Sequence, residues 1–200
     1  MKKYVMFFAV GTSVALVAGC DSVDDETPAG YTSFADIEVD ADAMQALYTD
    51  ANGNLIAGIT PATALEIPDT GNATYNGFVA GEVAGSRLIG ELTVTTFFDP
   101  GLGTITSSAT NFYHEDDGAY TGTLNGTGVL DQTATVPQIS TNLDGDLTNG
   151  GVVYDTSIAL EGDIIANGSD PIGAVAGFAD GSLDSGGSSE TFTGVFAAER

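Results

Sequence analysis

From residue 69 to the C-terminus, apolar and polar side chains alternate with a period of two, and this pattern constrains the fold more than any other. Turn-forming glycine, asparagine, aspartate and proline residues divide it into eight runs: 72–83, 87–98, 103–113, 119–131, 133–147, 152–166, 172–183 and 189–199. Successive side chains of a strand point to opposite faces, so each run predicts a β-strand with one apolar and one polar face. None of the runs predicts an amphipathic helix of ordinary length.

Glycines among the large apolar residues favour a closed barrel. In the run 119–131, Tyr120, Leu124 and Leu130 share their face with glycines 122, 126 and 128. Such a mixture suits a small barrel, in which strands bend sharply and eight strands leave an interior that side chains just fill. We therefore predict an all-β fold over residues 71–200, an eight-stranded antiparallel up-and-down barrel.

The predicted outer face carries threonine, asparagine, serine, aspartate and glutamate. A charged side chain that faced lipid at mid-bilayer would cost about 2 to 4 kcal/mol, so the pattern excludes a transmembrane barrel and places the outer face in water.

The first 20 residues have the parts of a secretory signal: Lys2 and Lys3, an uncharged apolar stretch at 4–17, and small Ala18 and Gly19 before Cys20. The stretch is shorter than the roughly 20 residues of a membrane-spanning helix. A small-residue cleavage site before a cysteine resembles the bacterial lipobox. The resemblance implies cleavage between Gly19 and Cys20 and acyl chains on Cys20, which would hold the protein to its membrane. The alternative is an ordinary signal peptide followed by an ordinary thiol.

These features predict a lipid-anchored protein of the cell envelope, in the outer membrane or on the cell surface rather than in the inner membrane. Asp21, after the acylated position, is the residue that favours inner-membrane retention in enteric bacteria, and that rule varies between lineages. Since Cys20 is the only cysteine, disulfides cannot stabilise the exported fold.

The formal net charge is -24, and it becomes -26 without residues 1–19 because Lys2 and Lys3 go with them. Arg87 and Arg200 are the cations that remain. Such a surface repels phosphate backbones and anionic head groups, which excludes nucleic-acid partners and membrane adhesion through basic patches. Salt should relieve the self-repulsion of the folded chain.

The composition divides the mature chain into three parts. Residues 20–33 are acidic and lack apolar periodicity, so we expect a lipidated cysteine followed by a disordered tether. Residues 34–70 have a mixed pattern and predict a short N-terminal handle, with a helical turn at 43–47 and a hairpin whose arms, 47–48 and 55–56, flank 50–54. Residues 71–200 form the barrel.

Four segments of the barrel resemble the C-terminal barrel domain of transferrin-binding protein B, a family of bacterial lipoproteins: 71–77 (GNATYNG), 119–123 (AYTGT), 176–181 (AGFADG) and 192–200 (FTGVFAAER). Ala197 and Glu199 stand where the family often has glycine and lysine. The resemblance implies an eight-stranded barrel that binds a protein or a small molecule without catalysis. It does not imply transferrin binding, which belongs to a larger multi-domain lobe of that family.

The sequence gives little support for a catalytic site or a metal-binding site. His114, the only histidine, lies in 112–118 (FYHEDDG), which is most simply a solvated turn, and no Gly-x-Ser-x-Gly motif accompanies it. One histidine and one lipidated cysteine cannot supply the usual zinc ligands. We predict no enzymatic activity, no catalytic residues, no metal site and no cofactor.

Two weaker possibilities stay open. The segments 50–54 (DANGN) and 142–146 (NLDGD) place oxygen ligands for calcium at alternate positions, yet neither continues to the bidentate glutamate of an EF-hand, and acidic turns explain both equally well. Phe78, Phe97 and Phe112 fall on the outward register and could form a partner patch or pack beneath the handle.

The sequence leaves two functions for the barrel. The first is a module that binds an external or periplasmic ligand, and the second is a structural envelope lipoprotein without a soluble ligand. An open cavity lined by aromatic residues would favour the first, whereas a filled interior with a broad apolar patch outside would favour the second.

Overall fold

The computed structural model describes residues 30–50 and 52–200, which form one helix and nine strands. In chain order these are α1 (Phe34–Tyr48), β1 (Gly71–Val83), β2 (Ser86–Phe98), β3 (Leu102–His114), β4 (Gly118–Gly122), β5 (Leu124–Asp131), β6 (Gln138–Asn149), β7 (Val152–Asn167), β8 (Asp170–Asp184) and β9 (Ser189–Glu199).

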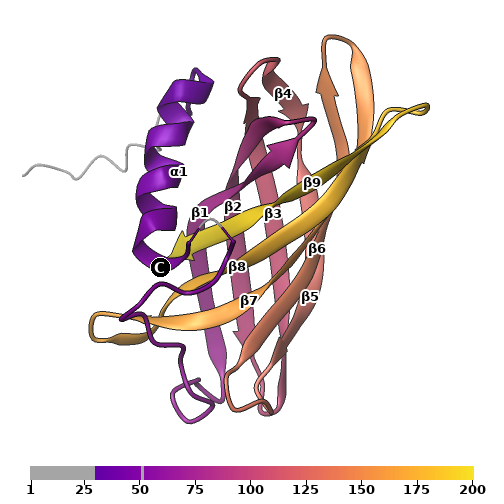
Figure 1. The fold of residues 1–200 in the computed structure, drawn as a ribbon. Coiled ribbons are helices and arrows are strands. Elements are labelled where there is room, and N and C mark those ends of the chain that lie inside the picture. The colour runs from indigo at the N-terminus through magenta and orange to yellow at the C-terminus, as the bar shows by residue number, and fades with distance from the viewer. Residues whose placement is uncertain (1–29, 51) are drawn as a thin grey trace, which may run out of the picture.

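The strands form a single antiparallel sheet that closes into a barrel-like ring (Figure 1). Closure lies between the first and last strands, where residues 76–82 of β1 pair with 193–199 of β9. β2 also pairs with β3, and β5 with β6, so eight strands complete the ring, while the short β4 adds a second link between β3 and β6. The prediction of an all-β, eight-stranded antiparallel arrangement is confirmed.

The stagger of the strands follows from the register. A path along paired residues begins at Phe97 of β2 and returns to β2 at Ile89, eight residues earlier; on the way it passes Thr104, Val129, Ser140, Glu161, Phe178, Val195 and Ala80. A ring of eight strands is just wide enough for side chains to fill.

The interior is filled in this way. Its largest side chains, Tyr75, Phe112, Phe192 and Phe196, are fully buried in one apolar cluster to which every ring strand contributes. Glycine provides their space: a Cβ on Gly90 would lie 2.4 Å from Cε1 of Phe112. Cβ atoms on Gly81 and Gly162 would likewise lie 2.6 and 2.9 Å from Phe192 and Phe196, so these three rings occupy the places of absent side chains.

The strand boundaries differ from the prediction in two places. The run 119–131 is two strands, β4 and β5, because Gly122 has a φ of +136°, a conformation that glycine adopts readily, and the ladder breaks there. The run 133–147 enters the sheet only at Gln138. The chain turns before it, where the Asp131 carboxylate accepts hydrogen bonds from the backbone N–H and the hydroxyl of Thr133 at 2.8 and 2.6 Å.

α1 is longer than the predicted helical turn at 43–47. Its first turn is capped by Ser33, whose Oγ accepts the backbone N–H of Asp36 at 3.2 Å. Ile37, Ala41, Met44 and Tyr48 follow at spacings of four, three and four and pack on the outer wall of the ring. Acidic residues lie between these four positions, so their helical spacing is difficult to recognise in the sequence.

Polar contacts also hold α1 to the ring. Arg87 of β2 lies 3.4 Å from Oε1 of Glu38 and 2.6 Å from Oδ1 of Asp42, and the Tyr48 hydroxyl donates to the Glu199 carboxylate at the end of β9. The helix thus contacts both strands beside the closure, β1 and β9, as well as β2.

The predicted hairpin after α1 is present. The backbone N–H of Asp50 donates to the Asn54 carbonyl at 2.9 Å, and that of Ile56 donates to the Tyr48 carbonyl at 3.0 Å. Farther on, Ala62 and Ile67 join the apolar cluster of the interior, and the Ala62 N–H donates to the Ile164 carbonyl at 2.8 Å. The handle therefore covers one end of the interior as well as part of the wall.

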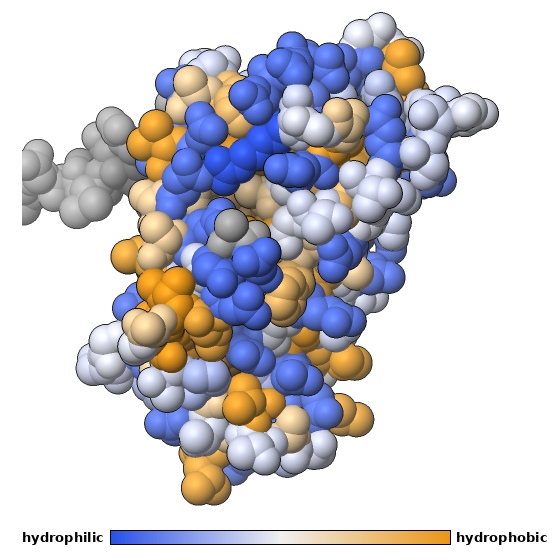
Figure 2. Space-filling view, in the orientation of Figure 1, coloured by the Kyte–Doolittle hydropathy of each residue, from blue (hydrophilic) through white to orange (hydrophobic). Residues whose placement is uncertain are grey.

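The outward positions of β2, β3 and β5 are mostly small and polar: Thr93, Thr95, Thr104, Thr106, Ser108, Asn125 and Thr127. Figure 2 shows hydrophilic and hydrophobic residues intermixed over the face in view. Within residues 30–50 and 52–200, helix length and apolarity fall short of what a membrane crossing requires.

Candidate functional site

The predicted cleavage and lipid-attachment residues, Gly19 and Cys20, lie outside the described residues, as do the signal peptide and most of the tether. Their assignment stays a prediction.

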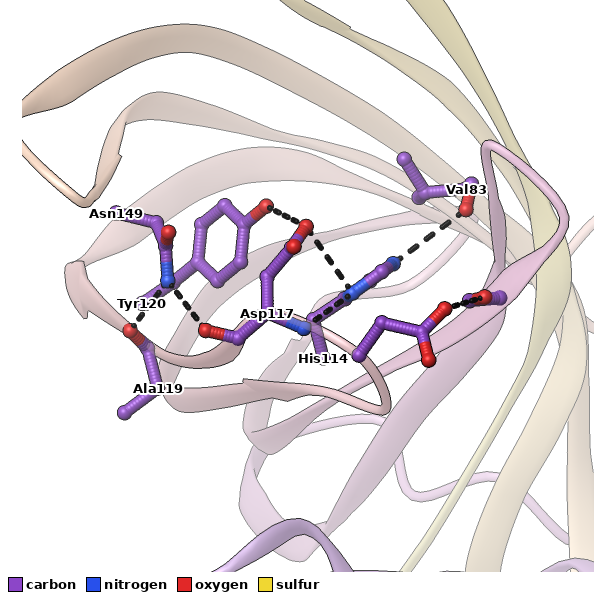
Figure 3. A network of polar contacts seen from close by, with 8 residues as sticks. Val83, His114, Asp117, Ala119, Tyr120 and Asn149 are labelled. Atoms are coloured by element: carbon purple, nitrogen blue, oxygen red, sulfur yellow. Dashed lines mark hydrogen bonds and ion pairs between the residues drawn. The ribbon is translucent and has the colours of Figure 1, made fainter.

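The structure overturns the prediction that His114 lies in a solvated turn. The side chain is only 6% exposed and points into one end of the ring, where β3 ends. Figure 3 shows it between Val83 and Asp117: Nε2 lies 3.4 Å from the Val83 carbonyl oxygen, and Nδ1 accepts the backbone N–H of Asp117 at 3.2 Å. Oδ2 of Asp117 lies 3.3 Å from the same Nδ1.

The contacts around His114 join neighbouring turns. The Tyr120 hydroxyl donates to Asp117 at 3.3 Å, and burial raises the pKa of that hydroxyl. The Asn149 amide donates to the carbonyls of Asp117 and Ala119 at 3.0 Å each (Figure 3). In the described part of the chain, no serine, threonine or cysteine side chain hydrogen-bonds to the imidazole. The arrangement fixes the end of the ring and provides no nucleophile for the histidine to activate.

One carboxylate in each of the two calcium candidates accepts hydrogen bonds from within the chain. Oδ1 of Asp50 accepts the backbone N–H groups of Asn52 and Asn54 at 2.8 and 3.0 Å, and these bonds, that of Asn54 first, lower the pKa of the carboxyl. Asp144 accepts the Ser157 hydroxyl at 2.6 Å on the outer wall. Within residues 30–50 and 52–200, no three acidic, histidine or cysteine side chains group together as metal ligands.

The three phenylalanines of the predicted patch do not lie together. Phe112 is fully buried because a β-bulge beside Asn111, whose φ is +52°, shifts the register of β3 and turns Phe112 inward. Phe78 is half-buried and meets the Tyr31 ring edge-on, with centroids 5.9 Å apart. Only Phe97 is exposed, at 42%.

The clear hollows lie on the outer wall. One, of about 580 Å³, runs between α1 and strands β1 and β2 and is lined by Tyr31, Met44 and Phe78 among others. Another, of about 440 Å³ and more enclosed, lies beneath the loop 53–55, over Glu161, Asp163 and Phe178. Alternation in the run 152–166 places Glu161 and Asp163 on its polar face, but it does not indicate the hollow, because the loop that covers them precedes them by more than 100 residues.

Comparison of the chain with protein-family models, curated proteins and solved structures finds no match. The resemblance to the transferrin-binding protein B barrel therefore stays a prediction.

Proposed function

We propose that the chain is a lipid-anchored protein of the bacterial cell envelope, in the outer membrane or on the cell surface, and that its ring is a non-enzymatic binding module. Acyl chains on Cys20 hold it to the membrane, and ligands meet the outer wall.

The filled interior is the observation that places the proposed binding surface on the outer wall of the ring. Buried side chains from all the ring strands occupy the space in which a barrel would enclose a small molecule, and Ala62 and Ile67 pack against one end. The other end holds the buried His114 contacts. Polar side chains that a partner could contact therefore lie on the outer wall of the ring, which also carries the hollows.

The anchor is tested by expressing the full chain and its Cys20→Ser variant in bacteria supplied with radiolabelled palmitate. We expect label and membrane sedimentation for the wild type and loss of both for the variant. A variant that sediments as the wild type does, or a wild type without label, would rule out the lipid anchor. Protease treatment of intact cells then separates surface display from a periplasmic location.

A structural envelope lipoprotein is the second candidate, and two observations favour it: the interior is filled, and apolar side chains are exposed together on the outer wall. Phe97, Leu102 and Val129, exposed at 42, 60 and 49%, lie around Thr104 on the outer wall of β2, β3 and β5. Such apolar side chains suit a permanent neighbour in the envelope. If these side chains contact a permanent neighbour, crosslinking at Thr104→Cys in intact cells should capture one partner, and adding Val129→Ser should reduce the amount captured. If the exposed side chains contact no partner, Val129→Ser should leave the amount of crosslinked product unchanged.

A further inference from the structure

The hollow beneath the loop 53–55 is built from two parts of the chain. Its floor is the outer wall of β6, β7 and β8, and its roof is the loop, which Asp50 holds through hydrogen bonds from Asn52 and Asn54. Gly53, with a φ of +75°, rests directly on the Phe178 ring: a Cβ there would lie 2.7 Å from Cδ1 of Phe178. The close approach of loop and ring gives the hollow a fixed edge.

The floor places two carboxylates next to an aromatic ring. Glu161 of β7 lies opposite Phe178 of β8 in the ladder, and Asp163 follows Glu161 on the same face of its strand. Side chains paired across strands in this way have Cβ atoms about 5 Å apart, and next neighbours along one face about 7 Å. A single ligand group can therefore touch all three side chains.

Neither carboxylate has a partner within the described residues. No hydrogen bond or ion pair joins Glu161 or Asp163 to another side chain, since Arg87 pairs with α1 and Arg200 pairs with Asp170. Asp163 is half-buried, and this burial raises the pKa of its carboxyl. A desolvated carboxylate without a partner is costly, and a bound cation would offset that cost.

The shape and chemistry of the hollow select an organic cation. A volume of about 440 Å³ is in the range of small-molecule sites, which begins at roughly 300 Å³. The described residues provide no metal-ligand cluster here, whereas the face of an aromatic ring attracts ammonium and guanidinium groups. Anions would be repelled by the two carboxylates.

We propose that this hollow binds a guanidinium or ammonium group between the Phe178 ring and the carboxylates of Glu161 and Asp163. The proposal deepens the outer-wall binding function and rests on it. The group can belong to a free amine or to an arginine or lysine side chain of a protein partner.

The test uses the full chain, purified from membranes in a non-ionic detergent, and calorimetric titration at 150 mM salt. Propylguanidinium represents a free cation, and an acetylated and amidated Gly-Arg-Gly peptide represents a protein side chain. Propylurea is the neutral isostere. We expect saturable binding of a cationic probe and none of propylurea, with shifts of the amide resonances of Asn54, Glu161 and Phe178. Tighter binding of the peptide indicates a protein partner, and tighter binding of propylguanidinium a free amine.

Variants separate this site from the general attraction of an acidic protein. Combined Glu161→Gln and Asp163→Asn should lower affinity about tenfold or more, and Phe178→Leu, which keeps apolar bulk without the ring, about two- to fivefold. Asp146→Asn removes a carboxyl of β6 outside the hollow and should leave affinity unchanged. Equal losses for Asp146→Asn and for the combined Glu161→Gln and Asp163→Asn variant, or binding of propylurea equal to that of the cationic probes, would overturn the proposal while leaving the lipid anchor untouched.

Discussion

At the scale of single residues, the interior depends on glycines that leave room for aromatic rings. Gly90→Ala should lower the free energy of unfolding by about 1 to 3 kcal/mol, because the new methyl group would overlap the buried Phe112 ring. Gly187→Ala is the matched control, since nothing lies within 4 Å of its Cβ position. Urea unfolding measures both, and equal stabilities would mean that the interior is looser than described.

Asp163 gives a pH-dependent prediction. Because its pKa is raised in the folded state, the unfolded chain releases this proton at lower pH, and the contribution of Asp163 to stability falls as pH rises through the folded pKa. Asp163→Asn should therefore be more stable than the wild type at pH 7, and the difference should vanish below the ordinary pKa of 3.8. Urea unfolding at several pH values checks the sign; a variant less stable at pH 7 would contradict it.

Single residues also show where prediction of the inner and outer faces from the sequence fails. Alternation identifies the inner face of a strand as long as the register is unbroken, as for Leu92 and Val94. It fails for Phe112 and His114, because the extra residue of the bulge beside Asn111 exchanges inward and outward positions. Phe112 had been assigned to the outward register for this reason, whereas His114 had been placed in a solvated turn because three acidic residues and a glycine follow it. Nothing in the local sequence distinguishes an asparagine with positive φ from one in an ordinary strand.

At the scale of elements, α1 is held by a narrow apolar stripe. Ile37 is fully buried between the helix and the wall residues Ala80 and Ile89, so Ile37→Ala should cost about 2 to 5 kcal/mol of docking free energy. Val39 on the same helix is 67% exposed, and Val39→Ala should cost less than about 0.5 kcal/mol. Hydrogen exchange of α1 amides should accelerate in the first variant only; equal exchange in both would contradict this packing.

The elements were predictable to the extent that their signals are local. Seven of the eight runs each correspond to a single strand of the ring, since turn residues and alternation both lie within each run. The length of α1 was missed, although Ser33 and the apolar stripe at 37, 41, 44 and 48 carry its signal. Between Ile37 and Met44, three of the four exposed residues are acidic or small, so the apolar residues of the stripe do not stand out in the sequence. The hollow beneath 53–55 depends on tertiary contact and has no local signal.

At the scale of the whole molecule, net charge should make stability depend on salt. With a formal charge of -24 and only four lysine and arginine residues, repulsion opposes the compact state. Salt shortens the Debye length from about 10 Å at 0.1 M to 3 Å at 1 M, so the melting temperature should rise by about 2 to 4 °C for each 1 kcal/mol of repulsion relieved. Calorimetry in NaCl and in KCl should give the same rise; no rise would show that repulsion is negligible.

Closure of the ring and the filled interior that results from it underlie the outer-wall function. Closure depends on the pairing of residues 76–82 with 193–199, strands separated by most of the described chain. Amide hydrogen exchange at these positions measures closure directly. The structure predicts protection as strong as that of the β7–β8 pairing, whereas exchange as fast as in the turn 132–137 would mean an open sheet with two free edges and would contradict the account.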